Sequence, residues 1–160
     1  MMTATGATKR ARADILTKWR QSIDAERGPS PFGAAPATSR FANPTGHLFE
    51  QTTELLLDWA LSDADVSEAH MALEDICRVR AVQGLSPAQA LRFIPDLKAI
   101  VRSVREGTQQ SEAEHAGLEQ LECRIDMLLL QAFDEYALQR ERIAEIRIDE
   151  IRRLYGRGAQ

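Results

Sequence analysis

Histidine and cysteine are the side chains in this sequence that could hold a metal ion or a haem. The chain has three histidines, His47, His70 and His115, and two cysteines, Cys77 and Cys123. Metal sites need such ligands at short, converging spacings. Because these residues stand far apart, we expect no metal and no cofactor. We interpret both cysteines as reduced, buried thiols, which indicates a cytoplasmic protein.

Neighbouring carboxylates are the residues that acid/base catalysis would use. The pairs Glu74 with Asp75 and Glu112 with Glu114 lie in stretches of helical pattern, where they are more simply explained as solvated helix faces. The sequence shows no serine or cysteine beside a histidine and an acid, and no glycine-rich phosphate loop after a strand. It therefore predicts a protein that is not an enzyme.

Charged residues inside apolar stretches are more informative. Arg78 and Arg80 interrupt one such stretch, and Arg124 with Asp126 precedes another. A buried arginine must find a carboxylate or backbone carbonyls, because an unpaired buried charge is strongly destabilising. Arg80 and Asp126 are the candidate buried pair. The alternative is that both side chains point into solvent.

Composition limits the classes of protein that this chain can belong to. It has 160 residues, a net charge of −4, 44% hydrophobic residues and 28% charged residues, as one globular domain of ordinary size would have. No basic excess favours nucleic acid. The longest apolar run, at 127–130, is far shorter than the ~20 residues that cross a bilayer. We expect no nucleic-acid partner and no membrane span.

Apolar residues recur at helical spacing along the chain, and no segment shows the alternation of a strand. We expect a disordered tail at 1–10 and a single helical domain at 11–155. A stretch rich in proline and glycine at 28–43 predicts a long loop. The ranges expected to be helical are about 11–25, 44–61, 67–82, 86–106 and 112–155.

Two local patterns mark the fourth of these ranges. Ser86, Pro87 and Gln89 are typical of a helix start, with serine as the cap, proline in the first turn and glutamine completing a capping box. Pro95 falls inside the continuing helical pattern. Since proline clashes with the carbonyl one turn earlier, we expect a kink or break around Leu91.

The segment 112–155 contains no proline, and a helix of this length would extend ~60 Å, about twice the diameter of a small domain. Its first half is strongly apolar. Its second half alternates acids with arginines and leaves a thinner apolar stripe of Ile143, Ile146, Ile151 and Leu154. We expect this half to project from the core and to carry dimerisation or partner docking.

Several short motifs give the chain a family resemblance. They are Arg78-Val79-Arg80-Ala81-Val82-Gln83, Ser86-Pro87-Ala88-Gln89-Ala90, Leu97-Lys98, Arg124-Ile125-Asp126, and Phe133-Asp134-Glu135-Tyr136 with Arg140. With these motifs the chain resembles the N-terminal domain of RsbRD-type proteins, relatives of the RsbR co-antagonists of bacterial stressosomes. The resemblance implies a globin-like sensory domain without haem, dimeric through its terminal helix. Relatives continue into a STAS domain, whereas this chain ends at Gln160, so we expect no STAS output.

The expected fold is therefore all-α, a globin-like or helical-bundle domain of about five helices with a long C-terminal helix. The expected function is that of a cytoplasmic regulatory or sensory module in a stress response, acting as a homodimer that docks a partner protein. The alternative is a globin-like protein that binds a small ligand or haem between the second, third and fourth helices. The candidate contacts to a partner or ligand are Arg78, Arg80, Gln89, Arg124, Asp126, Tyr136 and Arg140.

Overall fold

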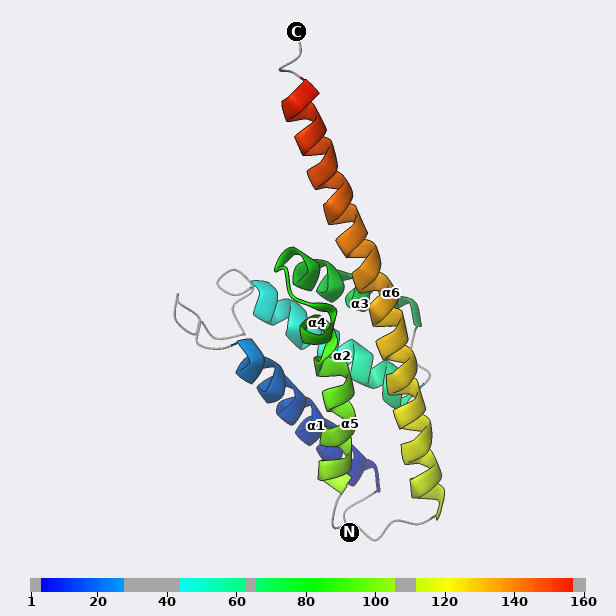
Figure 1. The fold of residues 1–160 in the computed structure, drawn as a ribbon. Coiled ribbons are helices and arrows are strands. Elements are labelled where there is room, and N and C mark those ends of the chain that lie inside the picture. The colour runs from blue at the N-terminus through cyan, green and yellow to red at the C-terminus, as the bar shows by residue number, and fades with distance from the viewer. Residues whose placement is uncertain (1–3, 28–43, 63–65, 106–111, 157–160) are drawn as a thin grey trace.

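The computed structural model describes residues 4–27, 44–62, 66–105 and 112–156. These residues form the helices α1 (Ala4–Arg27), α2 (Pro44–Leu61), α3 (Val66–Val82), α4 (Pro87–Leu91), α5 (Phe93–Arg105) and α6 (Glu112–Gly156). No strand occurs in the described ranges, and the all-α class with a long C-terminal helix is confirmed. The helices α2–α5 pack against the lower half of α6, α1 packs on α2 and α5, and the upper half of α6 stands clear of them (Figure 1).

The predicted break in the fourth helical range is confirmed. The helix α4 ends at Leu91 and α5 begins at Phe93, which divides one expected helix into two. Pro95 causes this break, because its ring excludes a regular helical contact with the carbonyl of Leu91. The capping box is also confirmed, since Gln89 N donates to Ser86 Oγ at 3.3 Å and Ser86 N donates to Gln89 Oε1 at 3.1 Å.

Two helix ends show how the local sequence sets their position. The helix α3 is followed by Gly84, whose φ of 72° lies in the left-handed region that favours glycine. At the other end of the chain, α1 begins at Ala4 rather than at Ala11. Alanine, lysine and arginine at 4–10 are good helix formers, which our expectation of a tail underestimated. Residues 1–3 of that tail, and the loop expected at 28–43, lie outside the described residues.

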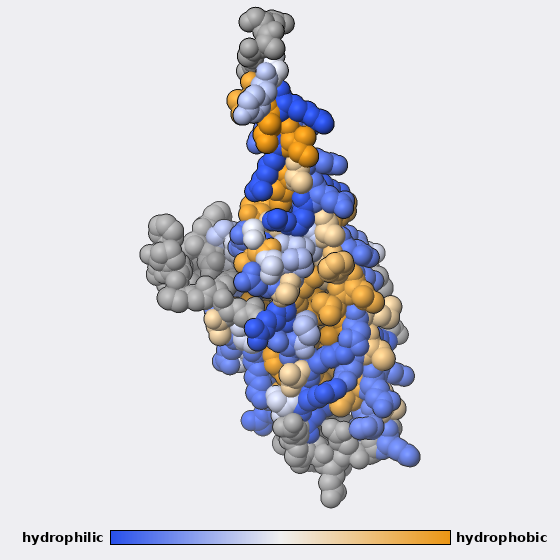
Figure 2. All heavy atoms as spheres, viewed as in Figure 1, coloured by the Kyte–Doolittle hydropathy of each residue, from blue (hydrophilic) through white to orange (hydrophobic). Residues whose placement is uncertain are grey.

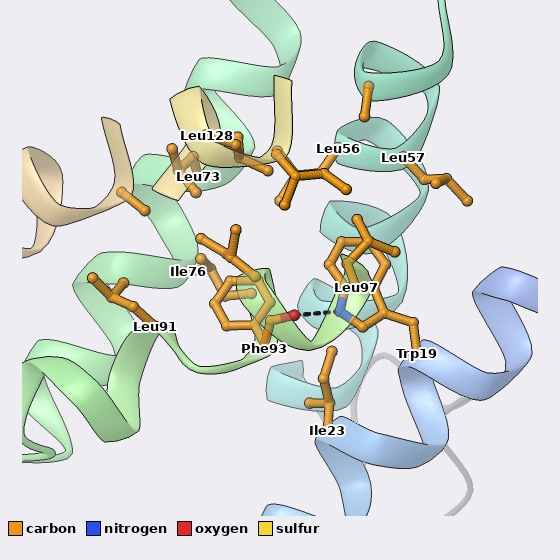
Figure 3. Packing of buried hydrophobic residues seen from close by; sticks show 14 of the residues in the cluster. Trp19, Ile23, Leu56, Leu57, Leu73, Ile76, Leu91, Phe93, Leu97 and Leu128 are labelled. Atoms are coloured by element: carbon orange, nitrogen blue, oxygen red, sulfur yellow. Dashed lines mark hydrogen bonds between the residues drawn. The ribbon is translucent and has the colours of Figure 1, made fainter. Parts of the chain in front are cut away.

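The centre of the fold is an aromatic junction between α1, α2 and α5. Trp19 is fully buried and stacks on Phe93 with ring centroids 6.1 Å apart, and Phe93 meets Phe49 edge to face at 6.2 Å. The indole Nε1 of Trp19 donates to the carbonyl oxygen of Phe93 at 2.6 Å, which Figure 3 shows as a dashed line. This bond satisfies the one polar atom of the Trp19 side chain inside an apolar core.

The lower half of α6 closes the core from one side. Leu121, Ile125, Leu128, Ala132 and Tyr136 are buried, and their spacing of three or four residues places them on one helix face. After Ile143, which packs partly against the core, every described side chain of α6 is exposed. None of the helices in the described ranges is both long enough and apolar enough to cross a membrane.

The bond between Trp19 and Phe93 gives a stability test. Trp19→Phe keeps an aromatic ring but leaves the buried Phe93 carbonyl without its indole donor. We expect the free energy of unfolding to fall by about 1–3 kcal/mol, measured by urea denaturation followed by circular dichroism. The matched control is Trp59→Phe on α2, a partly buried tryptophan, with an expected loss below about 1.5 kcal/mol. Equal losses in the two variants would contradict this role for Trp19.

Candidate functional site

Two predicted contact residues, Tyr136 and Arg140, tie α6 to the end of α3 and to the turn that follows it. The Tyr136 hydroxyl donates to the carbonyl oxygen of Leu85, and Arg140 Nη1 donates to that of Ala81 at 3.3 Å. The two side chains lie one helical turn apart on α6 and therefore act on the same side of the helix. This contact sits where α6 leaves the core, so it fixes the direction in which the upper half projects.

Arg80 is buried between aromatic rings. Its guanidinium carbon lies 4.8 Å from the ring centroid of Phe49 and 5.2 Å from that of Phe93. Its Nη1 donates to the carbonyl oxygen of Gln89 at 3.1 Å. A cation over an aromatic ring contributes about 2 kcal/mol when it is desolvated. Arg80 therefore joins α3 to the core and to α4, while the Gln89 side chain completes the cap of α4.

The prediction of a buried pair between Arg80 and Asp126 is wrong. Arg80 points inward as that pair required, but Asp126 points outward, as the alternative had it. The Asp126 carboxylate lies 2.6 Å from Lys98 Nζ and links α6 to α5 at the surface. The physical reason is the helical geometry, because Asp126 directly follows the buried Ile125 and adjacent helix positions point about 100° apart.

The other two predicted contact residues, Arg78 and Arg124, lie in different places. Arg78 is exposed and pairs with carboxylates of its own helix, at 2.6 Å from Glu74 and 3.1 Å from Asp75. Arg124 is partly buried, with Nη1 3.5 Å from the carbonyl oxygens at Trp59 and Ala60, near the end of α2. The seven predicted contact residues therefore do not converge on one point, and most of them join helices together.

Further polar contacts hold the lower half of α6 in place. Arg102 on α5 donates twice to Glu122, from Nε to Oε1 at 2.6 Å and from Nη2 to Oε2 at 2.7 Å. Hydrogen bonding to Arg102 lowers the pKa of Glu122 below its usual value. On the other side of the helix, His70 Nε2 of α3 lies 3.4 Å from Glu135 Oε1. These contacts orient α6 from two directions.

The histidines and cysteines show no common site. Within the described ranges, no group of three or more histidine, cysteine or acidic side chains is placed to hold a metal ion. Cys77 is buried, and desolvation, helped by the negative charge of Glu135, raises its pKa to about 12. Cys123 is exposed, so the prediction of two buried thiols is wrong for this residue. It lies on the side of α6 that faces away from the core.

Exposed apolar side chains of α6 lie on its upper half and on the outer face of its lower half, and Figure 2 shows apolar side chains over the upper half and over the middle of this helix. Of the stripe expected from the sequence, Ile143 packs against the core, while Ile146, Ile151 and Leu154 are exposed. Six further apolar residues of α6 are exposed although the sequence did not lead us to expect it: Met127, Leu130, Phe133, Leu138, Ile148 and Tyr155. The signal was present as a second set of apolar residues whose positions fall on one side of the helix, opposite the buried side.

A comparison with protein families places most of the chain in one of them. The family model described as the RsbT co-antagonist protein rsbRD N-terminal domain matches residues 13–151, which run from α1 into the projecting part of α6. The resemblance expected from the sequence motifs is thus confirmed. No curated protein matches the chain, and no solved structure matches it.

The contact between Arg102 and Glu122 predicts a pH effect. Because the folded-state pKa of Glu122 is lowered, its contribution to stability is present above the unfolded pKa of about 4.3 and is lost as the pH falls through the folded value. Arg102→Ala should raise the Glu122 pKa towards 4.3, roughly its ordinary value, in a carboxyl NMR titration. Arg92→Ala, a change at the residue between α4 and α5, should leave that pKa unchanged. An unshifted Glu122 in Arg102→Ala would refute the assignment.

The two thiols should differ sharply in reactivity. With a pKa of about 12, Cys77 carries only about one thiolate in ten thousand molecules at pH 8, and its side chain is buried. We expect a thiol reagent at pH 8 to modify Cys123 rapidly, and Cys77 only after unfolding, counted by mass spectrometry. In the folded Cys123→Ser variant, no thiol should be modified. Fast modification of this folded variant would show that Cys77 is accessible and reactive, which contradicts its burial and raised pKa.

Proposed function

Because the chain belongs to the RsbT co-antagonist RsbRD N-terminal domain family, we propose that it is a non-enzymatic, cytoplasmic regulatory module. The family is one of regulatory domains. The module acts in a stress response through α6, by forming a homodimer and by docking a partner protein. Its helical body receives the signal, and the projecting half of α6 delivers it.

The observation that carries this proposal is the exposed apolar surface at the end of α6. Ile148, Ile151, Leu154 and Tyr155 are 48%, 54%, 74% and 79% exposed. Burying a large apolar side chain contributes about 1.5–3 kcal/mol, so this segment favours association strongly. Isolated exposed apolar residues are common. Four of them within about two turns of the projecting half of α6, which its own body does not cover, are typical of an interaction site.

The charges around these residues fit a helix that pairs with another helix. Arginines and acids alternate on the upper half of α6, with Arg152 Nη1 3.5 Å from Asp149 Oδ1. Surface pairs of this kind contribute little stability, typically below about 1 kcal/mol. Their usual role on the flanks of paired helices is to select the partner and its orientation.

The contacts at Tyr136 and Arg140 support a signalling role for the projecting half of α6. They connect the base of the projecting half to the turn between α3 and α4, which itself is joined through Arg80 to the aromatic core. A change in the packing of the body therefore alters the direction of α6. A molecule that binds the projecting half of α6 acts on the body through the same contacts, since coupling between two sites is reciprocal.

Replacing Ile148 and Ile151 together by glutamate tests the proposal. The two carboxylates would have to be desolvated in the interface, so we expect the dimer to dissociate to monomer at micromolar concentration in sedimentation velocity. Arg142→Glu is the matched control, because it makes the same change of net charge on the polar face of α6. A native protein that is monomeric, or a double variant as dimeric as the native protein, would rule out dimerisation through this segment.

A further inference from the structure

The outer face of α6 carries a continuous line of residues that its own body does not cover. Spaced alternately by three and four positions, these residues form what we call the outer stripe: Met127, Leu130, Asp134, Ala137, Glu141, Ala144, Ile148, Ile151 and Tyr155. The buried residues Leu121, Ile125 and Leu128 lie on the opposite face of the helix. Of the stripe, only Ala137 is even partly buried. A second helix could therefore lie along its whole length.

The outer stripe has large apolar residues near both ends and small or acidic residues in its middle. Met127 and Leu130 are exposed at the lower end, and Ile148 and Ile151 at the upper end. Between them stand Asp134, Ala137, Glu141 and Ala144. This arrangement decides which orientation of a second copy fits, because the two possible orientations bring different residues together.

A parallel pair of stripes would place each residue against its own copy. Asp134 would then face Asp134 of the second copy, and Glu141 would face Glu141. Like charges directly opposed in a seam are destabilising. Alanine would also face alanine at Ala137 and Ala144, leaving space unfilled between the helices.

An antiparallel pair removes each of these conflicts. In one register Leu130 packs against Ile148 of the second copy, and by symmetry Ile148 packs against Leu130. The next residues match as well, with Met127 opposite Ile151. Asp134 and Glu141 then oppose the small Ala144 and Ala137, which leave room for the carboxylates to reach solvent. Large apolar residues thus meet large apolar residues, as helix packing requires.

The net charge along α6 favours the same orientation. Residues 112–139 contain seven acidic residues and one arginine, whereas residues 140–156 contain five arginines and four acidic residues. In the register given above, an antiparallel pair lays residues 123–138 of each copy, with three acidic residues and one arginine, along residues 140–155 of the other, with five arginines and four acidic residues. A parallel pair lays acidic on acidic along the whole lower half, which opposes association.

From these observations we propose that the outer stripe of α6 binds the outer stripe of a second copy of this chain in antiparallel orientation. The two helical bodies then lie at opposite ends of the paired helices. This inference rests on the proposed function, since it assumes that α6 is the dimerisation element. It adds the orientation, the register and the residues of the interface.

Cys123 is a natural probe of the orientation, because it is exposed and falls on the same outer line, four positions before Met127. In a parallel dimer the two Cys123 thiols would be adjacent and able to form a disulfide. In the antiparallel register they lie about 48 Å apart, and each Cys123 faces Tyr155 of the other copy. Buried Cys77, with its pKa of about 12, does not compete.

Mild oxidation of three full-length proteins, followed by non-reducing electrophoresis, tests the orientation. We expect Tyr155→Cys to form a disulfide-linked dimer, and the native protein and Tyr155→Cys combined with Cys123→Ser to stay unlinked. Disulfide linkage of the native protein and of the double variant as well would establish a parallel pair and overturn the inference. Because the helix end at Tyr155 could fray, Leu130→Cys/Ile148→Cys in the Cys123→Ser background serves as a second pair, and we expect it to link.

The same samples separate this inference from the proposed function. Sedimentation of the native protein reports whether it is a dimer at all. A dimer in which neither cysteine pair links refutes the antiparallel register but leaves docking through α6 standing. A monomer refutes both.

Discussion

The structure depends on one constraint, which is that α6 is a single uninterrupted helix longer than the body it packs against. It contains 45 residues and no proline, so its backbone hydrogen bonds continue from Glu112 to Gly156. At ~1.5 Å per residue it spans ~68 Å, well beyond the ~30 Å of a small domain. The helices α2–α5 cover only its lower half. The apolar residues of the upper half are not covered by the other described helices, and the proposed function rests on that observation.

A few residues of the body each contact several helices at once. Phe93 packs on Trp19 of α1, on Phe49 of α2 and under the guanidinium of Arg80 from α3. It opens α5 directly after the break that Pro95 imposes. Residues with several partners of this kind respond together to any local change, because protein interiors are close-packed. The same junction leads through α4 and its cap to the turn that Tyr136 and Arg140 hold.

Features set by neighbouring residues could be predicted from the sequence, and features set by distant residues could not. Pro95 and Ser86 act within one helical turn, so the break and the cap followed from local chemistry. The partner of Arg80 depended on how α3, α4 and α6 are placed in space, which periodicity does not encode. The exposure of Cys123 and Ile148 was missed because a helix was assumed to have one apolar face. In α6 one face serves the core and a second lies exposed.

The hydrogen bonds of Tyr136 and Arg140 fix α6, near its midpoint, to the end of α3 and the turn after it, so this is the point about which the upper half of α6 would tilt. From Arg140 to Tyr155 the helix extends ~22 Å. A tilt of only about 10° at Arg140 would move Tyr155 sideways by ~4 Å, comparable to the width of a side chain. Displacements inside the body that are too small to remodel any surface would thus be amplified into a shift that a bound protein can distinguish.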